Sequence, residues 1–202
     1  MSEDTKSKIV KSMLLLVSER GISGTSMDDL ALTVGIKKAS LYHYFRHKDS
    51  IVREMFKVYA PGKEVTVDID LSLPIDSILS SFLDSYVAIC CRGDVGRFFK
   101  AIESERFFSK EAGKLYIAQR KRMKKAITTL LKLIEKKKKG MFSTLESASQ
   151  VFFLFAYDSI ASHLLKENEE EGEKEAFISS FVNAYFLEGK NRKKTKEKKQ
   201  SL

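Results

Sequence analysis

The segment from Lys37 to Ser50, KKASLYHYFRHKDS, places cationic, hydroxyl and aromatic side chains in one short stretch near the start of the chain. Cations and hydroxyl groups hold phosphate oxygens, and lysine side chains can also donate hydrogen bonds to base edges. The sequence offers no glycine-rich phosphate loop, no nucleophile with an oriented base and no metal-ligand spacing. We therefore expect this segment to bind nucleic acid, and we expect no cofactor, no metal and no enzymatic activity.

Three basic residues, Arg46, His47 and Lys48, stand before IVREMFKVY, a segment predicted to be helical. A cation at a helix start is unfavourable by roughly 0.3 kcal/mol or more, because the helix dipole is positive there. A bound phosphate would reverse the sign of that penalty, since backbone N–H groups and Lys48 would then converge on it. Asp49 offsets part of the positive charge. The pattern indicates phosphate contact at this helix start.

Four helices are predicted around this segment. Apolar residues at helical spacing predict a first helix over 5–19, which ends at Gly21. Ser26 and Asp29 can form a capping box at the start of a second helix, which ends at Gly35. A short third helix follows over about 37–44, and a fourth begins near Lys48. The second and third helices, joined by VGIK, have the layout of a helix-turn-helix, whose second helix lies in the DNA major groove.

The stretch TSMDDLALTVGIKKASLYHYFRHKDSI resembles the DNA-binding signature of the TetR family of bacterial regulators, most specifically in the run Leu-Tyr-x-Tyr-Phe-x-x-Lys. The resemblance covers roughly residues 1–57. Two positions depart from the family pattern: Lys37 stands where Ser or Thr is usual, and Ala39 where Gly or Pro is frequent. The resemblance implies phosphate contacts from Ser26, Ser40, Tyr42, Tyr44 and Lys48, and base-edge contacts from Lys38, Ala39 and His43, with Met27 as a further candidate. Lys37, on the outward face of the third helix, completes the predicted DNA-binding set.

Composition and charge bound the class of protein. With 43% apolar residues, two Pro and ten Gly in 202 residues, the chain suits a globular helical fold. The apolar run MLLLV is too short to span a bilayer and precedes no small-residue cleavage site, so we expect a cytoplasmic protein.

The adjacent Cys90 and Cys91 are interpreted as buried free thiols. Residues 189–202 carry seven basic residues and one acidic residue, +6 of the formal +9, and either form a solvated tail or contact nucleic acid nonspecifically.

The remaining sequence predicts further helices over about 74–92, 94–106, 109–138, 144–167 and 173–189. Residues 65–73 alternate apolar and polar, as a strand would, but no partner strand is evident, and we interpret them as an extended linker. The predicted fold is all-α, with about nine helices. It divides into a three-helix DNA-binding unit over 1–47, a helical effector-binding and dimerisation domain over 48–189, and a basic tail over 190–202.

A homodimer is expected, because one helix-turn-helix makes too few contacts to select a site in a genome. Residues 151–165, VFFLFAYDSIASHLL, are apolar almost all the way around a helix, so such a helix must be covered on more than one side. Together with the last helix it could form a four-helix dimer interface. The predicted interface residues are Ala148, Ser159, Ser162, His163, Phe177, Phe181 and Tyr185.

Eleven of the fourteen Phe residues lie after residue 90, which indicates either an aromatic core or an apolar effector cavity. The family resemblance favours the cavity, because such regulators commonly bind a small molecule and then release DNA. A ligand would do so by preferring a dimer whose recognition helices are wrongly spaced, with the helix over 48–59 as connector. The predicted ligand-binding residues are Phe99, Ile102, Glu103, Phe107, Tyr116, Arg120, Phe152, Phe155 and Tyr157. The alternatives are an effector-independent DNA-bound protein of the same fold, with a structural or division-control role, and, with little support, an enzyme with a helical cavity.

Overall fold

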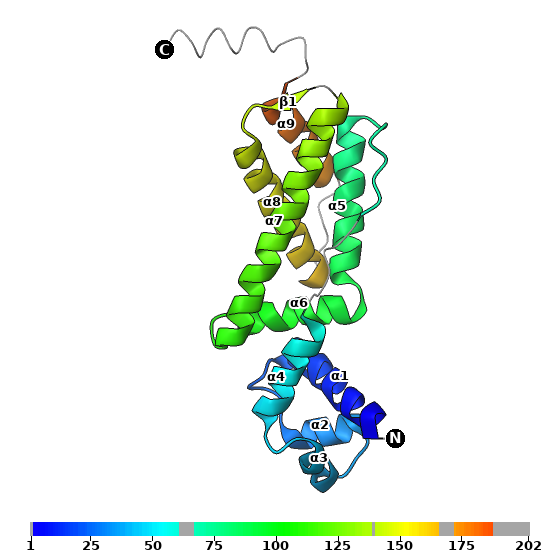
Figure 1. The fold of residues 1–202 in the computed structure, drawn as a ribbon, viewed down its shortest axis with the longest axis vertical. Helices are drawn as coiled ribbons and strands as arrows, with labels where there is room; N and C mark the ends of the chain where they lie inside the picture. The colour runs from blue at the N-terminus through cyan, green and yellow to red at the C-terminus, as the bar shows by residue number, and fades with distance from the viewer. Residues whose placement is uncertain (1, 61–66, 139, 166–171, 188–202) are drawn as a thin grey trace. The chain divides into compact units, whose positions relative to one another are not determined.

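The computed structural model of the chain describes residues 2–60, 67–138, 140–165 and 172–187 (Figure 1). Within these ranges the chain is all-α apart from two strands of two residues each, which confirms the predicted fold class. The elements are α1 (Ser2–Arg20), α2 (Met27–Val34), α3 (Lys38–Tyr44), α4 (Lys48–Tyr59), α5 (Ile75–Cys91), α6 (Gly93–Glu105), α7 (Lys110–Lys138), β1 (Met141–Phe142), α8 (Leu145–Leu165), α9 (Glu173–Tyr185) and β2 (Phe186–Leu187). The predicted helices agree with these bounds to within a few residues over the part that is described.

The chain forms two compact units, residues 1–63 with 90–119, and residues 64–89 with 120–202. We call them the N-terminal unit and the C-terminal unit. This division differs from the predicted boundary at residue 47. The cause is packing, because α4 and α6 bury apolar side chains in the same core as α1, α2 and α3.

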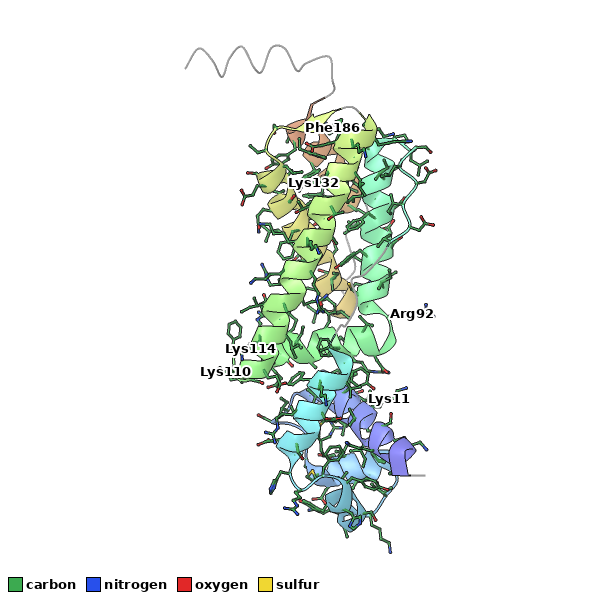
Figure 2. All side chains as sticks on the ribbon, viewed as in Figure 1. Lys11, Arg92, Lys110, Lys114, Lys132 and Phe186 are labelled. Carbon is green, nitrogen blue, oxygen red and sulfur yellow. The ribbon has the colours of Figure 1, made fainter. Side chains whose placement is uncertain are left out.

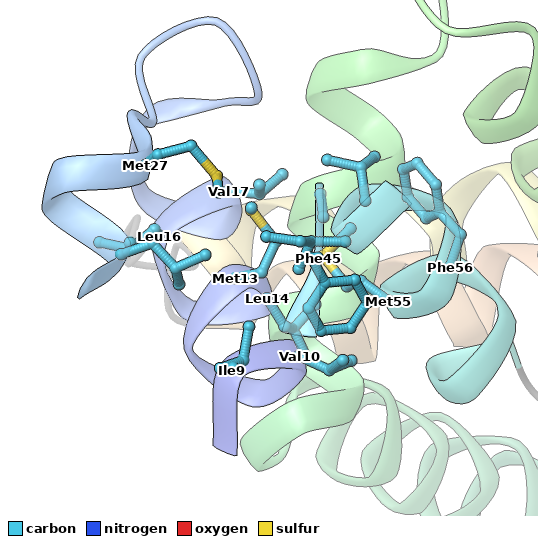
Figure 3. Packing of buried hydrophobic residues seen from close by; sticks show 14 of the residues in the cluster. Ile9, Val10, Met13, Leu14, Leu16, Val17, Met27, Phe45, Met55 and Phe56 are labelled. Carbon is cyan, nitrogen blue, oxygen red and sulfur yellow. The ribbon is translucent and has the colours of Figure 1, made fainter. Parts of the chain in front are cut away.

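The core of the N-terminal unit is built mainly on α1, whose Ile9, Met13 and Leu14 are fully buried (Figure 3). α4 adds Met55 and Phe56 to this core, and α6 adds further buried side chains. Phe98 of α6 meets Phe56 edge to face, with ring centroids 6.4 Å apart. Because α6 lies more than seventy residues beyond α1 in the sequence, this packing is non-local, and the helical periodicity of α1 could not have identified its partner.

The C-terminal unit is held together by aromatic side chains from α5, α8 and α9. Phe152 lies near the centre of this cluster, with ring centroids 6.4 Å from Phe82 and 5.3 Å from Phe181. β1 and β2 pair antiparallel, Met141 with Leu187 and Phe142 with Phe186. These two-residue strands are too short to show an alternating pattern, and the sequence did not predict them. The aromatic-core interpretation of the Phe residues is therefore correct at Phe152, which is fully buried.

Three sequence expectations concern the linker, the thiols and the tail. Residues 67–74 contain no strand, so the described part of the predicted linker is irregular, and Lys138 of α7 donates hydrogen bonds to the Ser72 and Leu73 carbonyl oxygens. Cys90 and Cys91 are thiols that form no disulfide, and burial raises their pKa to about 12 and about 11, so little thiolate forms near neutral pH. The tail over 190–202 lies outside the described residues.

In the described part of the chain, every helix is too short or too polar to cross a bilayer.

Candidate nucleic-acid interface

The start of α2 is fixed by the capping box that the sequence predicted. The Asp29 backbone N–H donates to Ser26 Oγ at 3.0 Å, and the Ser26 backbone N–H donates to Asp29 Oδ2 at 3.0 Å. The hydrogen bond from the Ser26 side chain holds the pKa of Asp29 below its usual value. These reciprocal bonds satisfy two backbone donors that a helix start otherwise leaves unpaired. Ser26 is exposed but is already engaged in this local structure, so a phosphate would bind beside an ordered helix start.

The turn between α2 and α3 depends on Gly35, which has φ 76° in the left-handed region that side chains with a Cβ rarely adopt. Its N–H and that of Ile36 each donate to the Ala31 carbonyl oxygen at 3.0 Å, which closes the end of α2. Leu41 of α3 is fully buried, and Phe45 follows it into the core. One face of α3 is thereby fixed against the unit, and the opposite face is fixed toward solvent.

The exposed face of α3 carries the polar residues predicted to meet DNA. Every predicted residue of this set from Lys37 to His43 is exposed: Lys37, Lys38, Ala39, Ser40, Tyr42 and His43. Lys38 Nζ donates to Asp28 Oδ2 of α2 at 2.8 Å, and this hydrogen bond raises the pKa of the ammonium group. Both partners of the pair are exposed, so it contributes little stability. Lys38 can therefore leave Asp28 for a base edge at small cost.

Two of the predicted contacts, Met27 and Tyr44, pack against the apolar core of the N-terminal unit. Met27 is only 9% exposed and belongs to the apolar core, so its side chain fills space between helices and does not reach a base. Tyr44 is half-buried and packs against the same core, so at most its hydroxyl edge is available to a phosphate.

Lys48 lies at the start of α4, as predicted, and also has an internal role that the sequence did not reveal. Its Nζ donates to the carbonyl oxygens of Ile22 and Thr25, at 2.8 and 2.9 Å. The ammonium group thus ties α4 to the turn that precedes α2. A lysine ammonium has three N–H donors, so one remains for a phosphate.

The same turn is held from its other side by Glu105, at the end of α6. Glu105 is 8% exposed, and its Oε1 accepts a hydrogen bond from the Ile22 backbone N–H at 2.7 Å. Gly21, with φ 73°, allows this approach, because a Cβ there would lie 3.0 Å from the same oxygen. Sequence reasoning missed Glu105, since its partner lies 83 residues away. The turn before α2 is therefore clamped between Lys48 and Glu105.

Replacement of Glu105 by alanine is expected to destabilise the N-terminal unit by about 1–3 kcal/mol, because the Ile22 N–H would lose its acceptor in a partly buried site. Glu105→Gln, the matched control, keeps an acceptor oxygen at the same position and should cost clearly less. Urea unfolding of the full chain measures both. Equal losses for the two variants would contradict a role for this hydrogen bond.

The nine predicted ligand-binding residues divide between the two units. In the N-terminal unit, Phe107 is 80% exposed, Ile102 is buried in the core with α1 and α4, and Tyr116 packs against that core. In the C-terminal unit, the Arg120 guanidinium lies over the rings of Phe153 and Tyr157, at 4.7 and 4.9 Å. Arg120 and Tyr157, two of the predicted residues, are thus in contact. Phe152 and Phe155 lie on the same helix as Tyr157, and Phe99 and Glu103 lie on α6.

The predicted dimer-interface residues also divide by exposure. Ala148, Ser159 and Phe181 are buried within the C-terminal unit. Ser162, His163, Phe177 and Tyr185 remain half-buried or exposed. Phe155 of α8 stacks on Phe177 of α9, with ring centroids 3.8 Å apart and planes 6° from parallel. Leu154 and Leu165 of α8, absent from the prediction, are 52% and 68% exposed.

Residues 10–55 match the family described as bacterial regulatory proteins, tetR family. Over 52 residues the chain is 48% identical to the biofilm operon icaADBC HTH-type negative transcriptional regulator IcaR of Staphylococcus aureus (strain Newman), a match that covers 26% of this chain and 28% of that protein. The chain thus matches little more than a quarter of that relative's length.

The fold is similar over a much longer range. A TetR transcriptional regulator from Agrobacterium tumefaciens superposes with a TM-score of 0.64 at 18% identity, covering 92% of this chain and 96% of that chain. NalD, the secondary repressor of the MexAB-OprM multidrug efflux pump in Pseudomonas aeruginosa, superposes with a TM-score of 0.57 at 16% identity, covering 92% of this chain and 98% of that chain. At these identities the similarity is one of fold.

Proposed function

We propose that the chain is a member of the tetR family of bacterial regulatory proteins, which residues 10–55 match, and that it is a homodimeric transcriptional repressor that binds a palindromic operator and acts in the cytoplasm. The structure of α3 carries the proposal. Leu41 anchors the apolar face of this helix in the core, and the polar face is exposed. The family consists of regulators and not of enzymes, which agrees with the chemistry of this face.

Within the proposed complex, the two kinds of DNA contact are assigned to different residues. Lys38, Ala39 and His43 would lie against base edges in the major groove, where lysine can donate to guanine. Phosphates would be held by the hydroxyl groups and the ammonium group around them: Ser26, Ser40, Tyr42, Tyr44 and Lys48. Lys37, exposed at the start of α3, would add a nonspecific cationic contact.

Dimerisation would use α8 and α9. Their apolar side chains that remain exposed or half-buried, among them Leu154 and the stacked Phe155 and Phe177, support this assignment. An isologous pairing of these helices from two copies would cover the apolar area. Such a dimer presents two copies of α3 to two half-sites.

The proposed effector is a small apolar or aromatic molecule. Arg120 with Tyr157 in the C-terminal unit supplies polar anchors beside aromatic rings, as ligand sites commonly do. Binding would favour a dimer whose recognition helices are wrongly spaced, with α4 as connector, so that DNA is released. Retained operator affinity in the presence of a tightly bound ligand would contradict this mechanism and favour the alternative, an effector-independent DNA-bound protein of the same fold.

Lys38→Ala and Lys48→Ala are expected to affect DNA binding in different ways. Loss of Lys38 should relax the sequence preference at one base pair. The binding free energy should weaken by about 1–3 kcal/mol, and on the matched site alone. Loss of Lys48 should weaken binding to all sequences alike. It should also reduce the slope of log affinity against log salt by the amount expected for about one phosphate contact. Titration of matched and singly mismatched duplexes at several salt concentrations measures both effects. Equal shifts on both duplexes for both variants would contradict the division of roles.

A further inference from the structure

The strongest concentration of charge in the described chain lies on α7, outside the helix-turn-helix. This helix contains eleven Lys or Arg residues and two Glu residues, a formal charge of +9. The whole chain has the same net charge, and residues 189–202 carry +6, so the remaining residues together are net negative, at −6. The positive charge is therefore localised on α7 and in residues 189–202.

Four of these cations, Lys121, Lys125, Lys132 and Lys136, form a row along the solvent face of α7 in the C-terminal unit. Their spacings of four, seven and four residues keep them within about 60° around a helix with 3.6 residues per turn. All four are exposed, and the opposite side of the helix is buried through Met123, Ile127, Leu130, Leu131 and Ile134. Figure 2 labels Lys132, on the side of α7 that faces the viewer. We call these four residues the lysine row.

Three of the four lysines in the row lack an ionic partner among the residues that the structure describes. Lys121, Lys132 and Lys136 form no ion pair with any residue that the structure describes. Lys138, two residues beyond the row, by contrast donates hydrogen bonds to backbone carbonyl oxygens. Like charges held at such short intervals repel one another, so the row is most stable when an anion lies along it.

We propose that the lysine row binds the phosphate backbone of DNA, independently of sequence, as a second nucleic-acid contact besides the helix-turn-helix. The row is about 22 Å long at 1.5 Å per residue, and one strand of B-DNA would run beside it for roughly six phosphates. Thr129 is exposed between the lysines, and its hydroxyl group can donate a hydrogen bond to a phosphate oxygen.

A linear polyanion fits the row better than an anionic membrane does. Helices that lie on membranes combine cations with bulky apolar side chains that enter the acyl boundary. Between Lys121 and Lys136 the only large apolar side chain exposed on α7 is Leu133, which is turned about 100° away from Lys132 around the helix. The buried apolar face of α7 belongs to the core of the C-terminal unit and is not available to lipid.

The test replaces all four lysines with glutamine, which has good helix propensity and removes only the charge. Binding of the full chain to a duplex without an operator is titrated between low and moderate salt. Four lost phosphate contacts should reduce the slope of log affinity against log salt by up to about 3.6, and weaken binding at low salt by at least about tenfold. The doubles Lys121→Gln with Lys125→Gln, and Lys132→Gln with Lys136→Gln, should each give about half the effect.

The matched control removes the same charge from the tail, through Lys193→Gln, Lys194→Gln, Lys196→Gln and Lys198→Gln. The proposal expects a clearly smaller change in slope for this control, and unchanged base preference in both quadruple variants. Equal loss in the two quadruple variants would show an effect of net charge alone and would overturn the proposal. It would also be overturned if the α7 variant kept its DNA affinity while losing binding to vesicles that contain an anionic phospholipid. Because no operator is used, the outcome does not depend on the proposed repressor function.

Discussion

Leu154→Glu is expected to convert the protein from dimer to monomer and to weaken binding to a palindromic operator by at least about 100-fold. Leu154 is 52% exposed on α8, beside Phe155, which stacks on Phe177 of α9. In an isologous interface the substitution would place two carboxylates, one from each copy, in apolar surroundings. A monomer retains a single α3 and therefore a single half-site.

Leu133→Glu is the matched control, since Leu133 is 46% exposed on α7, outside the proposed interface, and the change in charge is the same. Analytical ultracentrifugation gives the oligomeric state of each variant, and titration of a duplex with two half-sites gives the affinity. If Leu154→Glu remained dimeric with unchanged operator affinity, the α8–α9 surface would not be the interface.

The second large effect concerns the stability of the N-terminal unit. Phe98→Ala is expected to lower the free energy of unfolding by about 3–5 kcal/mol, because a large buried aromatic side chain would be replaced by a cavity. Phe98 is 2% exposed and contacts Phe56 of α4 edge to face. The loss would show that α6 is part of the core that carries the helix-turn-helix.

Phe108→Ala provides the comparison, because Phe108 is 87% exposed just beyond the end of α6, and its loss should change stability by less than about 0.5 kcal/mol. Urea unfolding monitored by circular dichroism measures both variants. Similar destabilisation in the two variants would contradict the burial of Phe98, and a negligible loss for Phe98→Ala would contradict the assignment of α6 to this core.

The sequence predicted the local part of the DNA-binding unit well, for physical reasons. A capping box such as that of Ser26 and Asp29 involves residues three apart, and the turn at Gly35 requires a conformation that glycine adopts readily. Helical periodicity likewise identified the face of α3 that contains Leu41 as buried. These features depend on neighbouring residues, so a single sequence contains the information.

Features that depend on distant residues could not be predicted in the same way. Periodicity indicates that one face of a helix is buried but not which element covers it, so the packing of α6 on α1 and the bond from Ile22 to Glu105 were missed. Met27 was misassigned for a related reason, since the family pattern gives a position near DNA and not the direction of the side chain. Lys48 was correctly placed at a helix start, but its bonds to the preceding turn became evident only in the structure.

The central claim is that α3 reads DNA sequence in a dimer. Selection of bound sequences from random duplex DNA by the purified protein, repeated at two salt concentrations, tests it most directly. The proposed function predicts recovery of a short palindrome whose half-sites are centred about one helical turn apart, or a multiple of that distance, at both salt concentrations. Recovery of no preferred sequence, with binding lost as salt rises, would contradict it, because only sequence-independent phosphate contacts would then remain.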